Sequence, residues 1–251
     1  MPASEAIVNP IKGSNAPDPG SLALLVGTLG DVNRLCGTMN LPKSQSRPIF
    51  ISRIYPQTDR LPGVSLTGPM IGAPYAVMIL ETLIAWGARR FIFFGWCGAI
   101  SPAVKIGDIL IPSAAVIDEG TSRHYRDGDA PLSRPAAAIT NTLKAGLRHK
   151  NVSFHEGPVW STDAIFRETT DKVRHYQAEG VLAVEMELSA LFTVANFRGV
   201  DLGGILLVSD ELSSLTWCPG FKEERFKRGR ETVCDLIDVV ARELSGGNDR
   251  P

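Results

Sequence analysis

VLAVEMELSALFTVANFRGVDLGGILLVSDEL, residues 181–212, is the stretch that decides the fold expected for this chain. It begins with a short apolar strand, continues with an apolar helix and ends with a second apolar strand. Strand, helix and strand in this order predict an α/β fold. Because ligands bind beyond the carboxyl ends of strands in such folds, Glu185, Glu187 and Asp210 are expected to point toward one pocket.

The same alternation of apolar strands and helices covers most of the chain. Strands are predicted at 22–26, 49–54, 64–67, 91–94, 108–111, 153–156, 181–184 and 204–208. Helices are predicted at 31–39, 73–86, 135–149, 168–179, 188–197 and 221–244. We therefore expect a single α/β domain over 22–244 with a largely parallel or mixed sheet covered on both sides. An irregular arm is expected over 1–21, where prolines and glycines show no apolar period, and a frayed tail over 245–251.

Composition limits the function. The chain has 251 residues, 26 basic and 27 acidic, and its net charge of −1 gives no basic field for nucleic acid or anionic lipid, so a small-molecule partner is expected. Its apolar runs are far shorter than the roughly 20 residues of a membrane span, and its N-terminus shows no signal-peptide pattern. The four cysteines are scattered without C-x-x-C spacing, which favours reduced thiols, a cytoplasmic location and no metal or cofactor.

Four loops at expected strand ends are the candidate binding segments. They cover 27–31, 67–74, 95–99 and 209–212. The run Gly95-Trp96-Cys97-Gly98 permits close approach of a ligand to the backbone, although glycines after a strand are also ordinary turn residues. Its spacing fits neither the dinucleotide fingerprint nor the P-loop, so phosphate cradling of those kinds is not expected.

Taken together, these motifs resemble the nucleoside phosphorylase and nucleosidase superfamily over about 22–243. The motifs that carry the resemblance are GWCGAI at 95–100 with VKIGDI at 104–109, DEGTSRHY at 118–125, VEME at 184–187 and SD at 209–210. The resemblance implies one α/β domain around a central, partly barrel-like mixed sheet flanked by helices. It also implies cleavage of the N-glycosidic bond of a nucleoside by a homo-oligomer, from dimer to hexamer.

The resemblance also assigns roles to residues. Glu187 would accept hydrogen bonds from the ribose hydroxyls, with Met186 against the sugar. Trp160 would stack beside the base, or else belong to the core. Asp210 would act as the acid toward the leaving base, or else cap a helix. The remaining predicted pocket residues are Gly27, Met70, Trp96 and Cys97, of which Cys97 is expected to have no nucleophilic role.

The base expected is a purine. Uridine phosphorylases of this family carry a Gln-x-Arg pair that reads the pyrimidine edge, and the corresponding positions here are Thr169 and Asp171. With that pair missing and Asp210 present, a purine-type base is predicted.

The phosphate site departs from the family. Phosphorylases of this family use two arginines and a Thr or Ser hydroxyl, and Asp31, Phe93 and Trp96 stand at those positions here. Asp31 would repel a phosphate by about 1 kcal/mol or more. Replacement cations could come from Arg34, Arg47 or Arg53, while Trp96 would fill the vacated pocket or pack in the core.

We therefore expect hydrolysis, with Asp31 as the base for water, Asp210 as the acid and Glu187 on the ribose. Asp31 would otherwise cap the helix that follows it. Two alternatives stay open: phosphorolysis with repositioned arginines, and a non-catalytic nucleoside-binding protein. The charged run 222–230 is expected to be a solvated helix face, preceded by Trp217, Pro219 and Phe221, which could cover the base.

Overall fold

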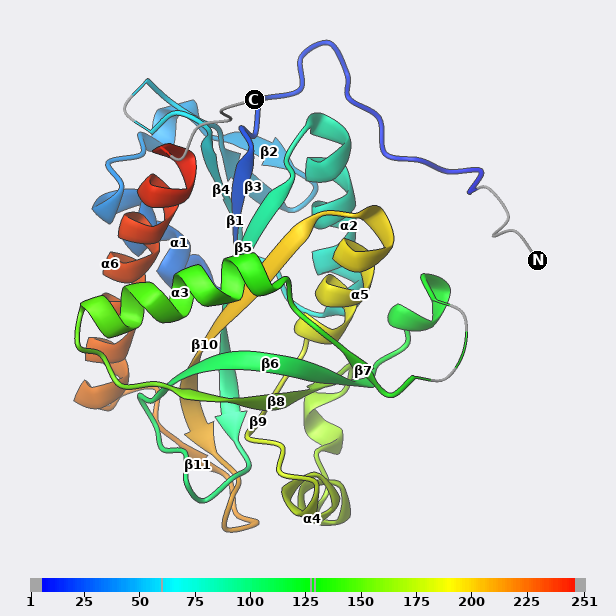
Figure 1. Cartoon of the computed structure of the whole chain (residues 1–251), viewed down its shortest axis with the longest axis vertical. Helices are drawn as coiled ribbons and strands as arrows, with labels where there is room; N and C mark the ends of the chain where they lie inside the picture. The colour runs from blue at the N-terminus through cyan, green and yellow to red at the C-terminus, as the bar shows by residue number, and fades with distance from the viewer. Residues whose placement is uncertain (1–5, 60, 127, 129, 247–251) are drawn as a thin grey trace.

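The computed structural model describes residues 6–59, 61–126, 128 and 130–246 (Figure 1). Its strands are β1 (Leu22–Val26), β2 (Arg47–Ile49), β3 (Ser52–Tyr55), β4 (Val64–Gly68), β5 (Arg90–Ala99), β6 (Ile109–Asp118), β7 (Leu132–Ser133), β8 (His155–Thr162), β9 (Ala183–Glu185), β10 (Asp201–Glu211) and β11 (Cys218–Pro219). Its α-helices are α1 (Leu29–Thr38), α2 (Ala73–Trp86), α3 (Ala137–His149), α4 (Thr170–Ala178), α5 (Leu188–Arg198) and α6 (Glu224–Gly246). Short 3-10 helices are η1 (Lys43–Gln45), η2 (Ser122–His124) and η3 (Ile165–Arg167).

The centre of the molecule is a closed ring of strands. β5 pairs with β10, β10 with β6, β6 with β8, β8 with β9, and β9 returns to β5. The ring contains both parallel and antiparallel pairs of strands. β1, β4, β3 and β2 extend the sheet outward from β5. The single α/β domain with a mixed, partly barrel-like sheet that the sequence predicted is confirmed.

Helices cover the sheet on two sides. In Figure 1, α2 and α5 lie on one side of β1 and β5, and α1, α3 and α6 lie on the other. The side chains of β1 alternate between two apolar clusters, one with each group of helices, and none is more than 1% exposed. A strand covered on both faces needs apolar residues at every position, which is why β1 has the continuous sequence LALLV.

Several boundaries differ from the sequence prediction, including the ends of β5, β6, β8 and β10, and two segments have a different structure from the one predicted. β5 continues through 95–99, a segment predicted as a loop, because β9 and β10 pair with it on both sides. The predicted strand over 49–54 is wrong: β2 and β3 form a hairpin whose turn includes Phe50 at a φ of +50°.

The ends of the chain are only partly described. Residues 6–21 contain neither helix nor strand, and this arm is held to α2 where Lys12 Nζ donates to the Trp86 carbonyl at 2.7 Å. Helix α6 extends to Gly246, so the first two residues of the predicted tail are helical. Positions 1–5 and 247–251 of the predicted arm and tail lie outside the described residues.

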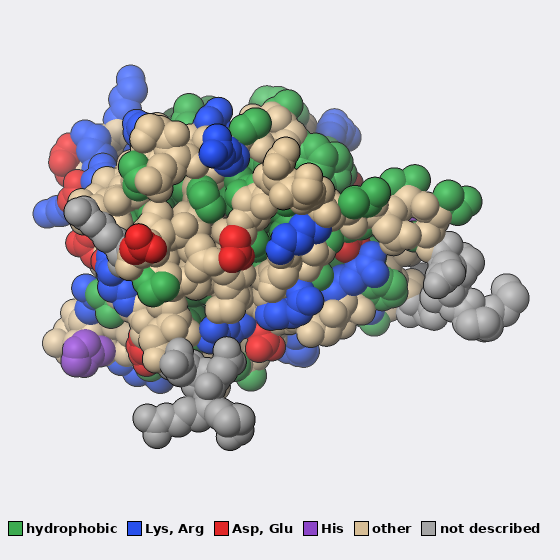
Figure 2. Space-filling view, turned by 90° about the horizontal axis from the view of Figure 1, so that it is seen from above, with side chains coloured by type: hydrophobic (Ala, Val, Ile, Leu, Met, Phe, Trp, Pro, Cys, Tyr) green, Lys and Arg blue, Asp and Glu red, His purple; other side chains and the backbone are tan. Residues whose placement is uncertain are grey.

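Figure 2 shows the face at the top of Figure 1, where groups of Lys and Arg side chains are separated by acidic, apolar and neutral ones. This mixed pattern agrees with the nearly balanced charge of the chain. None of the helices in the described part of the chain is both long enough and apolar enough to cross a membrane.

Candidate active site

The predicted site residues gather at one edge of the sheet. Gly27 follows β1, Met70 follows β4, Cys97 lies near the end of β5, and Asp210 lies near the end of β10. Because β4, β1, β5 and β10 run parallel, their carboxyl ends meet at the same edge. Two contacts tie the loops together: Gly27 N donates to the Phe94 carbonyl at 2.9 Å, and Met70 N donates to the Gly27 carbonyl at 3.2 Å.

Glu187 is a buried carboxylate at the start of α5, 7% exposed, with half-buried Met186 before it. The Gly72 N–H, at the start of α2, donates to Glu187 Oε1 at 2.5 Å. Burial, together with the charge of Glu185, raises the pKa of Glu187 to about 8. The carboxyl therefore keeps its proton at neutral pH unless a ligand favours the charged form.

Glu185 orients Glu187 by binding its backbone. Its Oε2 accepts the backbone N–H groups of Glu187 at 2.7 Å and Leu188 at 2.8 Å, and the Ser161 hydroxyl donates to its other oxygen. Burial raises the pKa of Glu185 to about 7. A further buried carboxylate, Glu119, accepts the Ser189 hydroxyl at 3.0 Å. Sequence reasoning missed Ser161 and Glu119, which bind Glu185 and the first turn of α5.

Asp210 lies at a β-bulge, where the pairing of β10 with β5 shifts between Val208 and Asp210. Bulges re-aim side chains beside active sites. The Ser209 hydroxyl donates to Asp210 Oδ1 at 2.6 Å and the Trp217 indole N–H donates to Oδ2 at 2.9 Å. Asp210 is in a strand, so it caps no helix.

A second acid, Glu168, lies near Asp210 in the segment between η3 and α4. Burial and then the charge of Asp210 raise the pKa of Glu168 to about 7. Nothing in the sequence pointed to this residue. With a pKa of about 7, its carboxyl is protonated about half of the time at neutral pH.

The two acidic centres flank one position of β5. Gly98 pairs with Val184 of β9 on one side and with Asp210 of β10 on the other. Two strand spacings separate these flanking strands, which is roughly 10 Å. Glu187, which follows β9, and Asp210, in β10, are therefore placed on either side of β5.

Cys97 lies between them and is 3% exposed. Burial raises the pKa of its thiol well above the usual value, and the charges of Asp210 and Glu185 add to the effect. A thiol that keeps its proton is a poor nucleophile, so its contribution is to packing.

Trp160 is buried in the apolar cluster between β8 and α4. Its indole is completely buried, packs on Tyr176 at a centroid distance of 4.5 Å and donates to Asp118 Oδ2 at 3.0 Å. Because side chains alternate along a strand, Ser161 points toward Glu185 and Trp160 points to the α4 side. The structure places Trp160 among buried core residues. A stacking role beside the base stays a prediction.

Asp31 is not a free base. It is 1% exposed and lies in the first turn of α1, where its N–H donates to the Thr28 hydroxyl oxygen at 3.2 Å. Its carboxylate accepts three donors at 2.7 Å each: the Thr28 hydroxyl, the Trp96 indole N–H and Arg230 Nε. The predicted base role has no support in this geometry, and Asp31 is part of a buried ion pair.

The cation beside Asp31 comes from an unexpected place. Arg230 lies at the end of the run that the sequence assigned to a solvated face, and its side chain is only 19% exposed. Two of the three predicted cations are engaged elsewhere: Arg34 pairs with Glu231 at 3.2 Å, and Arg53 donates to Ser46 at 2.7 Å.

The Asp31–Arg230 pair should be important for stability. We expect Arg230→Met to lower the free energy of unfolding by about 3 kcal/mol, because the buried carboxylate of Asp31 loses its cation. Arg242→Met on the same helix, which breaks the more exposed pair with Asp238, should cost less than about 1 kcal/mol. Urea unfolding measures both; equal losses would contradict a special role for the buried pair.

An aromatic segment joins the Asp31 region to Asp210. Trp96 packs against Phe226 at a centroid distance of 4.9 Å and against Phe221 at 6.0 Å, and Phe221 lies 6.4 Å from Trp217. Trp217 in turn donates to Asp210. Phe221 and Trp217 remain 44% and 60% exposed, so the segment covers this edge from outside.

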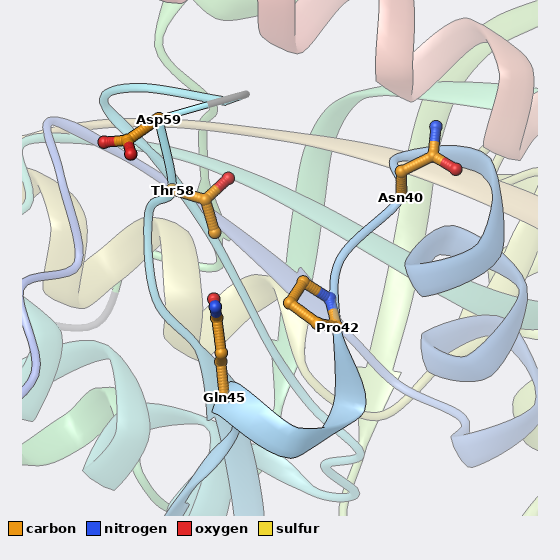
Figure 3. A pocket seen from close by; sticks show the side chains of 5 residues that line it. All are labelled: Asn40, Pro42, Gln45, Thr58 and Asp59. Carbon is orange, nitrogen blue, oxygen red and sulfur yellow. The ribbon is translucent and has the colours of Figure 1, made fainter.

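Two surface hollows lie outside this constellation. One of about 460 Å³ adjoins the aromatic segment and is lined by Pro219, Phe221, Lys222 and Glu223. The other, of about 540 Å³, lies between the loop after α1 and the loop between β3 and β4 (Figure 3). That second loop precedes β4, so this hollow lies at the opposite edge from Glu187. Among the described residues no group of three potential ligands for a metal ion occurs.

Comparison with known proteins adds independent information. A family model described as "Phosphorylase superfamily" matches residues 21–242. The chain is 28% identical over 198 residues to a guanosine phosphorylase of Halorubrum lacusprofundi, covering 78% of this chain and 80% of that one. It is 32% identical over 212 residues to a uridine phosphorylase of Thermococcus kodakarensis, covering 76% and 74%. A purine nucleoside phosphorylase structure from Toxoplasma gondii matches with a TM-score of 0.79 at 19% identity, covering 92% and 94%, a likeness of fold alone.

Proposed function

Because the chain belongs to the phosphorylase superfamily, we propose that it cleaves the N-glycosidic bond of a purine-type nucleoside. The observation that carries this proposal is the placement of Glu187 and Asp210 on either side of Gly98. One of the relatives is named for guanosine, a purine nucleoside, and another for uridine. We favour the purine because an acid at position 210 can protonate a ring nitrogen of the leaving base.

The proposed mechanism uses two carboxyl groups in different roles. Glu187 accepts hydrogen bonds from the ribose hydroxyls, and its negative charge stabilises the cationic sugar that forms as the bond breaks. Asp210 donates a proton or a hydrogen bond to the base, and Glu168, with its pKa of about 7, is a proton source beside it. Met186, Met70 and Gly27 complete the proposed lining, while Trp160 is left out of it.

We propose water as the acceptor. Asp31 and Trp96 replace a cation and a small hydroxyl residue, and they bind each other rather than leaving room for an anion. The guanidinium of Arg230 is already neutralised by Asp31. Water needs little help from a base because the cationic sugar is a strong electrophile. The proton that the water loses on bonding to the sugar passes to solvent, and solvent returns a proton to Asp210, so the mechanism does not depend on Asp31.

Phosphorolysis is the second candidate. The names of the relatives favour it, since they are phosphorylases of guanosine and uridine. In that case Arg230 would have to exchange Asp31 for phosphate.

The test is a product analysis of purine and pyrimidine nucleosides with phosphate present and omitted. We expect free base and free ribose at the same rate in both buffers, with purines preferred. Sugar 1-phosphate as the main product would establish phosphorolysis instead. Tight nucleoside binding without release of base would mean that the chain is a non-catalytic nucleoside-binding protein.

Two features of the proposal concern the setting of the enzyme. A homo-oligomer follows from the family resemblance, and a cytoplasmic location follows from the scattered free cysteines. Both stay predictions.

A further inference from the structure

The Asp31 carboxylate is bound as a separate oxyanion would be. Its Oδ2 accepts the Thr28 hydroxyl and the Trp96 indole N–H, and its Oδ1 accepts Arg230 Nε, all at 2.7 Å. A hydroxyl, an N–H and a guanidinium are the donors that proteins use for carboxylate, phosphate or sulfate. Asp31 is only 1% exposed, so its carboxylate fills the space that these donors face.

The surroundings hold the guanidinium in position. The central carbon of Arg230 lies 5.3 Å from the Trp96 ring centroid and 6.0 Å from that of Phe226. Its Nη2 would be 2.7 Å from a Cβ at position 30, so Gly30 leaves the space that this group occupies. These contacts hold the guanidinium over the first turn of α1, in addition to its ion pair with Asp31.

Backbone contacts connect the loop of this oxyanion site with the proposed sugar site. The carbonyl of Gly27, which precedes Thr28, accepts the N–H of Met70 at 3.2 Å. Two residues after Met70, the Gly72 N–H donates to Glu187. The loop that begins α1 is therefore tied to the loop that binds the carboxylate proposed for ribose.

We infer that Asp31 is the residue that determines the acceptor: it is an internal anion that occupies an oxyanion subsite and thereby excludes phosphate from the reaction. This inference rests on the proposed glycosidic cleavage. The charge of Arg230 is cancelled by Asp31, and a phosphate beside it would meet a negative charge instead of a net positive one. Removing the carboxylate should leave the three donors available to inorganic phosphate or sulfate.

The test is Asp31→Ala, examined by thermal unfolding in phosphate, in sulfate and in chloride at equal ionic strength. Wild-type Tm should be the same in all three. The variant should gain about 3–6 °C in phosphate or sulfate at ten times the Kd. The double variant with Arg230→Met should lose this gain. If Asp31→Ala does not fold, Asp31→Ser, which still offers an oxygen to Arg230, replaces it.

Nucleoside turnover provides the second readout. In phosphate the folded variant should form sugar 1-phosphate, whereas the wild type forms ribose. A wild type stabilised by phosphate, or a folded variant with no anion effect, overturns the inference. The unfolding assay needs no nucleoside. If the wild type does not cleave nucleosides, the proposed function is wrong, but the effect of phosphate on the Tm of Asp31→Ala still tests the anion site.

Discussion

Asp210→Asn should lower kcat for release of a purine base by about 10²–10³-fold, within the range that a positioned general acid contributes. The amide keeps the size of the side chain and an oxygen that can accept the Trp217 N–H, so the fold should be retained. It cannot deliver a proton to the ring nitrogen of the base. Steady-state release of guanine from guanosine measures the effect, and thermal unfolding checks the fold.

Asp118 offers a matched control. It also lies at the carboxyl end of a strand, β6, and it also accepts a tryptophan N–H, that of Trp160 at 3.0 Å. Asp118→Asn should leave kcat within about twofold, because this carboxylate faces the α4 side. Unchanged kcat in Asp210→Asn, or equal losses in both variants, would remove Asp210 from the chemistry and make its role structural.

The parts of the fold that the sequence predicted well are those set by local pattern. β1 and α2 were predicted to the residue, at 22–26 and 73–86. β1 is a continuous apolar run, and α2 is bounded by glycines, with Gly72 at a φ of +80° and Gly87 at +126°. The ends of β5 and β10 were missed because pairing across the barrel, rather than local composition, extends them through Gly-rich and polar residues.

In the candidate site, too, the residues that could be predicted are those with a local sequence pattern. Glu187 and Asp210 could be proposed because each stands in a short motif at a strand end. For Trp160 two roles stayed open, because a sequence does not say which face of β8 the side chain occupies. Arg230 had no local signal at all, since it is 199 positions from Asp31 and its neighbours are those of a solvated helix.

Glu187→Gln should lower kcat/KM by about 10²-fold or more. The Gly72 N–H requires an acceptor at Oε1, so the amide nitrogen of the variant would be turned toward the ribose. The sugar hydroxyls would then meet a donor in place of a charged acceptor. Two hydrogen bonds to a charged group at about 1.5–3 kcal/mol each account for the size of the loss.

The pH dependence of nucleoside binding distinguishes this role from a structural one. The pKa of Glu187 is raised to about 8, so the carboxyl is protonated in the free protein at pH 6–7, and ribose favours the charged form. Affinity should therefore rise as pH increases toward about 8, by at most tenfold per pH unit. Glu185 is the carboxyl group whose charge acts on Glu187, and Glu119 in turn acts on Glu185. Glu187→Gln should abolish most of this dependence. Glu81→Gln, which changes a buried carboxylate on neighbouring α2, should keep it. If the affinity of the wild type does not change with pH, ribose does not bind the Glu187 carboxylate. A ligand that favours the charged form of this carboxyl must displace its proton, so the affinity of such a ligand has to depend on pH.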